Sequence, residues 1–292
     1  MNAPDPSFMQ LRPRLFGIAY RMLGSRADAE DVLQEAWLRW HATDRARIAV
    51  VEAWLVTVVT RLSIDKLREH KRDQYSGPWL PEPVVEFADD ALSQLEFAHD
   101  VSLAFLQLLE KLSPEERAAF LLRETFDMDY AEIAALLEKS QAACRQLVHR
   151  AKERLAAPEA RFLVNETEHR QVLSRFIAAA QSGHREALMA IFTPQATFVG
   201  DGGGKVLSTL RPLRGAERLA EFYLVRARYG HVPELRYVAA RINGRPGLLR
   251  YLNGKLDAAI DISVEAGQVS AVRVVRNPDK LARIHAGTLV TN

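Results

Sequence analysis

The sequence predicts a multidomain fold, in which two all-helical modules precede an α+β domain with a cone-shaped sheet. Apolar residues recur at three- and four-residue spacing in residues 8–75 and 91–156, the period of amphipathic helices. A proline-rich segment separates these two stretches. Towards the C-terminus, alternating apolar and polar residues lie between turn signals, which indicates antiparallel strands. We expect modules at 1–75, 96–160 and 161–292, with a linker at 76–95.

The first module contains an amphipathic helix with an unusual polar face. Ser25 follows Gly24 and can cap this helix. Its apolar stripe consists of Ala29, Val32, Leu33, Ala36, Trp37 and Trp40. The opposite face carries Asp31, Gln34 and Glu35 around Leu38. This face is either a docking surface for a basic partner helix or an ordinary solvated face, and the helix alone favours the second reading.

A later helix of this module starts apolar near Val51 and ends basic. Its basic residues are Arg61, Lys66, Arg68, Lys71 and Arg72. Three acids are interspersed, so the segment carries a net charge of about +2. This charge suits contact with nucleic acid.

The linker has an unexpected composition. Three prolines, Pro78, Pro81 and Pro83, favour extended backbone. A simple spacer would be polar, whereas this one carries Trp79 and Leu80. We expect Trp79 to pack against another part of the protein.

The second module has the pattern of a helix-turn-helix. The sequence SPEE, from Ser113 to Glu116, is a capping box with proline at the first helical position. Asp129 opens a short helix and Ser140 caps the last one. The buried stripe of the last helix is Cys144, Leu147, Val148, Ala151 and Leu155. Its outward residues are Gln141, Arg145, Gln146, His149, Arg150 and Lys152.

The third module changes in texture. Three helices are expected. The first ends near Gly183, the second ends before Pro194, and the third begins after Gly215. Strands come next, with turns at Asn253-Gly254 and Ala266-Gly267. The loop DGGGK, Asp201 to Lys205, lacks the spacing of a phosphate-binding loop, so we interpret it as a glycine-rich turn that could contact another module.

The composition restricts the class of protein. The net charge is only +2, so the distribution of charge must decide whether nucleic acid is a partner. One cysteine, Cys144, excludes an intramolecular disulfide and a cysteine-built metal site, and it is better read as a core residue than as a redox sensor. No signal peptide or membrane span is visible, so we expect a cytoplasmic protein without membrane contact. The histidines are scattered, and no metal or cofactor is expected.

These motifs together resemble a bacterial sigma factor of the extracytoplasmic-function class. DAEDVLQEAWLRW and WLVTVVTRLSIDKLRE resemble region two of such proteins. LSPEERAAFLLRETFDMDYAEIAALLEKS and CRQLVHRAKERL resemble region four. The third module resembles the SnoaL-like branch of the NTF2-like folds. WLPEP, DGGGK and NPDKL together look like the markers of one subgroup, sigma factors with a fused SnoaL-like domain.

The resemblance implies a promoter-specificity subunit and not an enzyme. Its partners would be promoter DNA and core RNA polymerase, through the β′ and β subunits. Polymerase would bind Asp31, Gln34, Glu35 and Leu38. The minus-ten element would be read and opened by the basic helix, through Arg61, Lys66, Arg68, Lys71 and Arg72. The minus-thirty-five element would receive Ser140, Gln141, Arg145, Gln146, His149, Arg150 and Lys152. The last helix also carries groups suited to base edges and phosphates.

The same resemblance implies regulation in cis by the C-terminal domain. The linker residues would be Trp79, Leu80, Pro81, Glu82 and Pro83. The domain would contribute Asp201, Lys205, Asn277, Pro278, Asp279, Lys280 and Leu281. A small-molecule ligand in the cone is a further option, since such cones often hold a pocket.

Two departures and two rival hypotheses remain. Glu138 stands where a glycine often fills the helix-turn-helix turn, and Ala142 and Ala143 replace polar residues. One rival is an NTF2-like enzyme fused to a DNA-binding unit, which needs an acid–base pair inside the cone. Its candidate residues are His184, Asp201, Tyr223, His231 and Tyr251. The other rival is a one-component regulator that binds DNA without polymerase.

Overall fold

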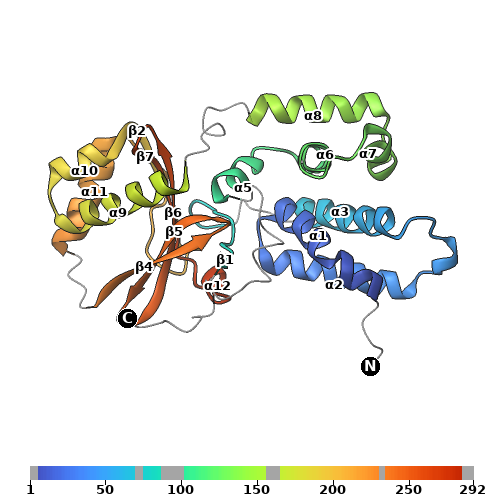
Figure 1. Ribbon diagram of the computed structural model, residues 1–292, viewed down its shortest axis with the longest axis horizontal. Coiled ribbons are helices and arrows are strands. Elements are labelled where there is room, and N and C mark those ends of the chain that lie inside the picture. The colour runs from blue at the N-terminus through green and yellow to red at the C-terminus, as the bar shows by residue number, and fades with distance from the viewer. Residues whose placement is uncertain (1–5, 70–74, 87–101, 156–164, 230–233, 285–292) are drawn as a thin grey trace. The chain divides into compact units, whose positions relative to one another are not determined.

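A computed structural model describes residues 6–69, 75–86, 102–155, 165–229 and 234–284 (Figure 1). The chain forms two compact units. Unit 1 contains residues 1–72 and 105–160, and unit 2 contains residues 73–104 and 161–292. The linker between the two helical modules is therefore grouped with the C-terminal domain.

The first helical module of unit 1 is built from three long helices. They are α1 (Pro6–Leu23), α2 (Arg26–Ala42) and α3 (Val51–Glu69), with a short 3₁₀ turn η1 (Arg45–Arg47) before α3. Ser25 caps α2 as predicted, because its hydroxyl accepts a hydrogen bond from the Asp28 amide at 3.2 Å. The predicted stripe of α2 is buried except for Trp37, which is half-buried.

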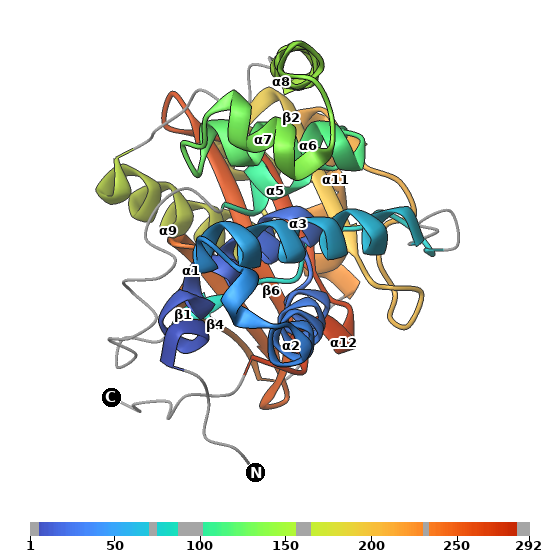
Figure 2. The same ribbon diagram turned by 90° about the vertical axis from the view of Figure 1, so that its right-hand side faces the viewer.

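The second helical module follows from α5 (Leu103–Leu109), which straddles the boundary between the units. Its helices are α6 (Pro114–Glu124), α7 (Tyr130–Leu137) and α8 (Gln141–Leu155), and Figure 2 looks along the axis of α8. Ser113 and Glu116 form the predicted capping box. Asp129 opens α7 with a second capping box, and the buried stripe of α8 is the predicted one.

The α7–α8 turn keeps the geometry that glycine favours. Glu138 adopts φ 55° and ψ 45°, in the left-handed region. A side chain there costs roughly 1–2 kcal/mol relative to glycine. The turn is therefore regular despite the departure in sequence, and Glu138 bears local strain.

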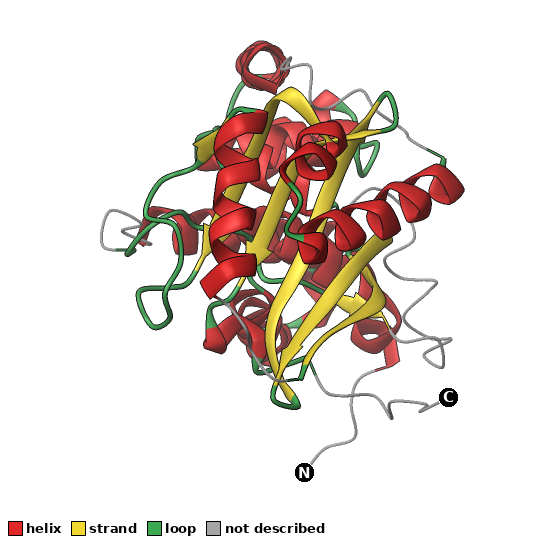
Figure 3. Ribbon diagram, turned by 90° about the vertical axis from the view of Figure 1, so that its left-hand side faces the viewer, coloured by secondary structure: helices red, strands yellow, loops and turns green. Residues whose placement is uncertain are grey.

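Unit 2 is a curved seven-stranded sheet with helices packed on it (Figure 3). The longer helices are α9 (Glu166–Ser182), α10 (Arg185–Ile191) and α11 (Ala216–Tyr229), and α12 (Pro278–Leu281) is a single turn. The strands are β1 (Val85–Glu86), β2 (Phe192–Asp201), β3 (Leu213–Arg214), β4 (Leu235–Ile242), β5 (Arg245–Leu252), β6 (Lys255–Glu265) and β7 (Gln268–Val275).

The strand order is β1-β4-β5-β6-β7-β2-β3. Strands β4 to β7 form an antiparallel meander, and its turns at Asn253-Gly254 and Ala266-Gly267 have positive φ at both positions, as the predicted tight hairpins require. The expectation that strands begin only after the third helix is wrong. Strand β2 lies between α10 and α11 and pairs in parallel with β7, although it contains Pro194.

Both faces of this sheet are covered. One face packs under α9, α10 and α11, with Phe176, Phe192 and Tyr223 in its core. Alternate residues of the same strands form a second cluster on the other face, where Leu80 of the linker is fully buried. The linker is thus part of the folded domain, and β1 extends the sheet by pairing with β4.

Candidate functional site

The acidic face of α2 lies at the surface, as predicted. Asp31 and Gln34 are exposed, Glu35 is half-buried, and Leu38 keeps 50% exposure. Asp31 is engaged within the module, since Lys66 of α3 binds its carboxylate at 2.8 Å and that of Asp28 at 2.9 Å. Burial alone would lower the pKa of Lys66, but these two carboxylates outweigh it and raise the pKa above its ordinary value.

The basic side chains of α3 contact the second helical module inside unit 1. Arg61 donates to the Leu136 carbonyl at 3.0 Å and pairs with Glu138 at 2.9 Å. Arg68 pairs with Glu115 at 2.8 Å, and Lys139 binds the same carboxylate at 3.1 Å. These predicted DNA-binding arginines are therefore occupied in this arrangement. Lys71 and Arg72 lie outside the described residues.

Helix α8 presents its polar side chains to solvent. The exposed residues are Gln141, Arg145, Gln146, His149, Arg150 and Lys152. The Ser140 hydroxyl caps the helix by accepting from the Ala143 amide at 3.1 Å. The guanidinium of Arg145 lies 5.5 Å from the ring centre of Tyr130 on α7, which steadies it. The α8 side chains predicted to contact DNA therefore lie at the surface.

Glu116 anchors the other side of α8 to α6. Its side chain is almost fully buried. Its carboxylate forms ion pairs with Arg150 at 3.2 Å and with Arg154 at 2.6 Å. Burial alone would raise the pKa of Glu116, but the Ser113 hydrogen bonds and the two arginines hold the pKa below its ordinary value. Arg150, predicted to contact DNA, therefore also has a structural partner.

The most completely built polar site is centred on Asp201 of unit 2. Its carboxylate is fully buried at the end of β2. It accepts hydrogen bonds from the Tyr75 hydroxyl at 2.5 Å and from the Leu80 amide at 2.9 Å. Lys280 of α12 compensates its charge at 2.7 Å. A buried carboxylate would be costly without these partners, so Asp201 ties the linker to the domain.

Lys280 and Asn277 complete this site, which we call the linker clamp (Tyr75, Trp79, Leu80, Asp201, Asn277 and Lys280). The Lys280 ammonium donates to the Leu80 carbonyl at 2.5 Å and lies 4.3 Å from the Trp79 ring centre. The Asn277 amide group donates to the Tyr75 hydroxyl at 2.9 Å. Burial and Asp201 raise the pKa of Tyr75 above its ordinary range, so its hydroxyl stays a donor.

The glycines of DGGGK allow close approach at the clamp. Gly203 and Gly204 have φ of 62° and 70°. A Cβ on Gly203 would lie 2.4 Å from the Asn277 side chain, and one on Gly204 would lie 2.8 Å from the Cβ of Ser76. The loop therefore needs glycine to contact the linker, and Lys205 at its end pairs with Asp279 of α12.

A second attachment follows along the linker. The Val84 amide donates to the Asn243 side-chain oxygen at 3.1 Å, and the Asn243 amide donates to the Val84 carbonyl at 2.8 Å. The intervening residues Pro81, Glu82 and Pro83 are buried, as is Leu281 of α12. Sequence reasoning did not assign Tyr75 or Asn243 to this site. Their signals were an aromatic residue directly before the linker and a second Asn-Gly pair, at Asn243-Gly244.

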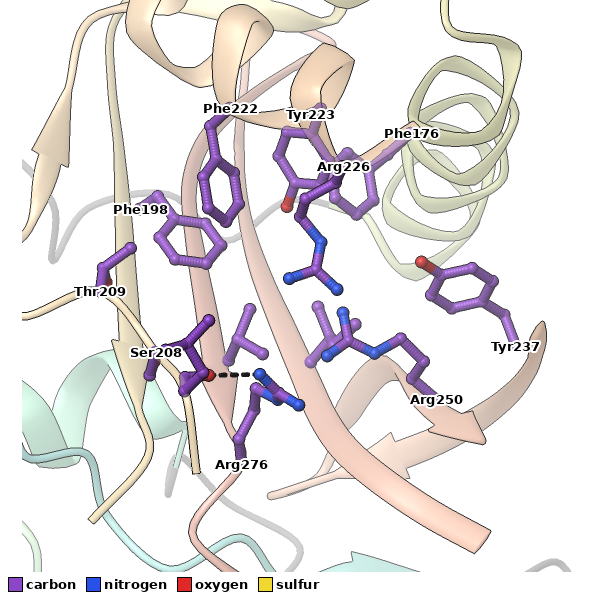
Figure 4. A pocket seen from close by; sticks show the side chains of 13 residues that line it. Phe176, Phe198, Ser208, Thr209, Phe222, Tyr223, Arg226, Tyr237, Arg250 and Arg276 are labelled. Carbon is purple, nitrogen blue, oxygen red and sulfur yellow. Dashed lines mark hydrogen bonds between the residues drawn. The ribbon is translucent and has the colours of Figure 1, made fainter. Parts of the chain in front are cut away.

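A cavity in the α+β domain opens between α9, α11 and the sheet (Figure 4). Of the enzyme candidates that the structure describes, only Tyr223 lines the cavity, and burial raises the pKa of its hydroxyl. Asp201 belongs to the clamp, and His231 lies outside the described residues. Among the described lining residues there is no histidine or carboxylate to make an acid–base pair.

No described helix is long and apolar enough to cross a membrane. Nowhere in the described part of the chain do three or more histidine, cysteine, aspartate or glutamate side chains gather in a way that could hold a metal ion.

Comparison with known proteins assigns both helical modules. Residues 8–73 match the family Sigma-70 region 2, and residues 102–155 match Sigma-70, region 4. The chain is similar to the ECF RNA polymerase sigma factor SigJ of Mycobacterium tuberculosis, with 39% identity covering 94% of this chain and 91% of that protein. It is also 29% identical to the probable ECF RNA polymerase sigma factor SigI of the same species, over 98% of each chain.

The solved structures agree. The crystal structure of Mycobacterium tuberculosis SigJ matches with a TM-score of 0.77 and 36% identity, covering 94% of this chain and 97% of that one. This match extends through both helical modules and the α+β domain, which confirms the predicted fold class. The chain therefore belongs to the extracytoplasmic-function (ECF) sigma factors of RNA polymerase.

Proposed function

We propose that this sigma factor is regulated in cis by its own C-terminal domain, through the linker clamp. A sigma factor of this family directs core polymerase to promoters in transcription initiation. The observation that supports regulation is the buried Asp201 carboxylate, whose partners are the linker groups Tyr75 and Leu80 together with Lys280. A domain without any role in the linker would have no need of a buried charge there.

The exposed positions of the α2 and α8 side chains support the following assignment of promoter and polymerase contacts. Polymerase, through its β′ and β subunits, docks on Asp31, Gln34, Glu35 and Leu38 of α2. The minus-ten element is taken by the basic end of α3. Helix α8 enters the major groove at the minus-thirty-five element, with Gln141, Arg145 and Gln146 towards base edges. The protein works in the cytoplasm without enzymatic activity, and a small molecule in the cavity is a candidate effector.

Regulation has a geometric basis. The two promoter elements lie about 25 base pairs apart, or about 85 Å at 3.4 Å per base pair. In unit 1 the two helical modules contact each other directly, as between Arg61 and Glu138 at 2.9 Å. They must separate to span the promoter. Holding the linker sets how far and how readily they do so, because two tethered modules gain affinity only when the tether matches their separation.

The test is run-off transcription with purified core polymerase. Three chains are compared: the full chain, the full chain with Asp201→Asn, and a chain cut after residue 157. We expect Asp201→Asn to change output in the same direction as the cut, because both release the linker. Glu217→Gln serves as the control, since Glu217 is exposed on α11 and is not part of the clamp. Equal output from all chains at every promoter would contradict cis regulation.

A separate substitution distinguishes the sigma factor from a one-component DNA-binding regulator. Charge removal at Asp31 and Glu35 is expected to abolish co-elution with core polymerase while the helical content by circular dichroism stays unchanged. Retained promoter-dependent transcription in that variant would contradict docking through α2.

A further inference from the structure

The cavity of the α+β domain brings three arginine guanidiniums against a wall of aromatic rings. Arg226 comes from α11, Arg250 from β5 and Arg276 from the residue after β7, and Figure 4 shows their head groups converging. The rings are Phe176, Phe198, Phe222, Tyr223 and Tyr237. The cavity volume is about 130 Å³. An apolar cavity of about 150 Å³ holds benzene, so the space suits one ring.

Positive charge exceeds negative charge at this cavity. Asp257 binds Arg250 at 2.8 Å and Arg276 at 2.6 Å. Burial would raise the pKa of Asp257, but these two arginines hold the pKa below its ordinary value, so it stays ionised. Among the described residues no carboxylate pairs with Arg226, whose guanidinium rests 5.7 Å from the Phe222 ring centre. The Arg226 residue as a whole is exposed at the rim of the cavity. Partial burial of its head group and the like charges of Arg250 and Arg276 lower the pKa of Arg226 below its ordinary value, as expected for three cations brought together.

Two polar atoms at the cavity have no partner. The Nε of Arg276 and the hydroxyl of Thr209 are buried, and neither makes a hydrogen bond within the described structure. Unpaired buried groups of this kind are rare in native proteins and destabilising. Both residues line the cavity. This end of the cavity is therefore short of polar partners, and a ligand with acceptor oxygens there would offset the repulsion among the arginines.

We propose that the cavity binds a small organic anion, built from one aromatic or alicyclic ring and an oxyanion group such as a carboxylate. The ring packs against Phe198, Phe222 and the neighbouring aromatic residues. The oxyanion accepts from Arg226 and Arg276. Apolar walls alone would fit a neutral ring, and the arginines alone would fit a free inorganic anion. Their juxtaposition selects a ligand with both parts.

Occupancy of the cavity is coupled to the linker clamp, a step that rests on the proposed function. The backbone amides of Arg276 and Asn277 donate to the Asp201 carbonyl at 2.7 and 3.0 Å. The Arg276 guanidinium also donates to the Leu207 carbonyl in the loop that follows DGGGK. The anion binds most tightly to the domain when the linker is held, so it stabilises that state. By thermodynamic linkage, holding the linker raises the affinity of the domain for the anion.

The experiment is isothermal titration of the full chain with four probes: benzoate, phenyl phosphate, benzyl alcohol and inorganic phosphate. We expect one of the two ring-bearing anions to bind at least tenfold more tightly than benzyl alcohol and inorganic phosphate, because each lacks one part. Arg226→Met should weaken binding at least tenfold, and Arg226→Lys less. Arg218→Met, the same change at a position of α11 that does not line the cavity, should leave binding unchanged.

Equal binding of benzyl alcohol and benzoate, no effect of Arg226→Met, or no binding of either ring-bearing anion below about 10 mM overturns the cavity site. Asp201→Asn is expected to weaken binding of the anion, and an unchanged affinity overturns the coupling between cavity and clamp. The two proposals fail separately. If the anion binds but Asp201→Asn has no effect on transcription, cis regulation is contradicted. If Asp201→Asn changes transcription but no ring-bearing anion binds, only the cavity site is contradicted.

Discussion

At the scale of single residues, side chains with strained or buried geometry mark the places where structure is constrained. Asp201 is a buried charge whose partners come from two segments distant in sequence, the linker and α12. Glu138 is a side chain in a conformation that glycine favours. Neither feature follows from residue type, since aspartate and glutamate are ordinary surface residues.

Glu138→Gly is expected to raise the free energy of unfolding by about 0.5–1 kcal/mol, because relief of left-handed strain exceeds the loss of the exposed Arg61 pair. Thermal unfolding followed by circular dichroism measures it. Glu138→Ala is the control, since it removes the same ion pair and keeps the strain. Identical melting temperatures for the glycine and alanine variants would show that the strain is negligible.

At the scale of elements, the packing of α8 on α6 depends on Glu116. Its folded-state pKa is depressed, so its stabilising contribution is complete above the unfolded pKa of about 4.3 and disappears as pH falls through the folded value. Glu116→Gln should cost about 1–3 kcal/mol at neutral pH and flatten the acid side of the stability profile. Urea unfolding from pH 7 to about pH 3 tests this. Glu153→Gln, in an exposed pair on α8, should change little.

A further element-scale prediction concerns β1. Asn243→Gly keeps the positive φ of its turn and removes the side-chain oxygen that holds the Val84 amide. Hydrogen exchange at Val84 and Val85 should accelerate about tenfold, which corresponds to roughly 1.4 kcal/mol. Asn253→Gly makes the same change in an exposed turn and should leave these amides as protected as before.

At the scale of the whole molecule, a held linker should make promoter spacing matter more. The full chain is expected to lose activity more steeply than the chain cut after residue 157 when two or three base pairs are inserted between the promoter elements. The reason is that a tether of fixed reach tolerates only a narrow range of separations. Run-off transcription on a spacer series measures the two profiles. Parallel profiles would mean that the linker is unconstrained in the transcribing complex.

Much of this protein could be predicted from local sequence. Caps at Ser25, Ser113 and Asp129, the stripe of α8 and the turns at Asn253-Gly254 and Ala266-Gly267 depend on neighbours within a few residues, so their signals lie in short windows. The outward side chains of α8 and the exposed acids of α2 follow from the same periodicity. The family resemblance rests on these windows together with the three short motifs WLPEP, DGGGK and NPDKL.

What only the tertiary structure decided is which distant segments meet. Strand β2 pairs in parallel with β7. Local sequence did not predict β2, because it contains Pro194, a residue that is unfavourable inside a strand. Tyr75, Asp201 and Asn277 converge from positions up to 202 residues apart, and a carboxylate is stable there only because the fold delivers donors to it. The arginines of the cavity lie on three separate elements. The sequence by itself determined the helices, the turns and the class of protein, because those depend on local periodicity. The clamp and the cavity depend on long-range packing, which no short window of sequence contains.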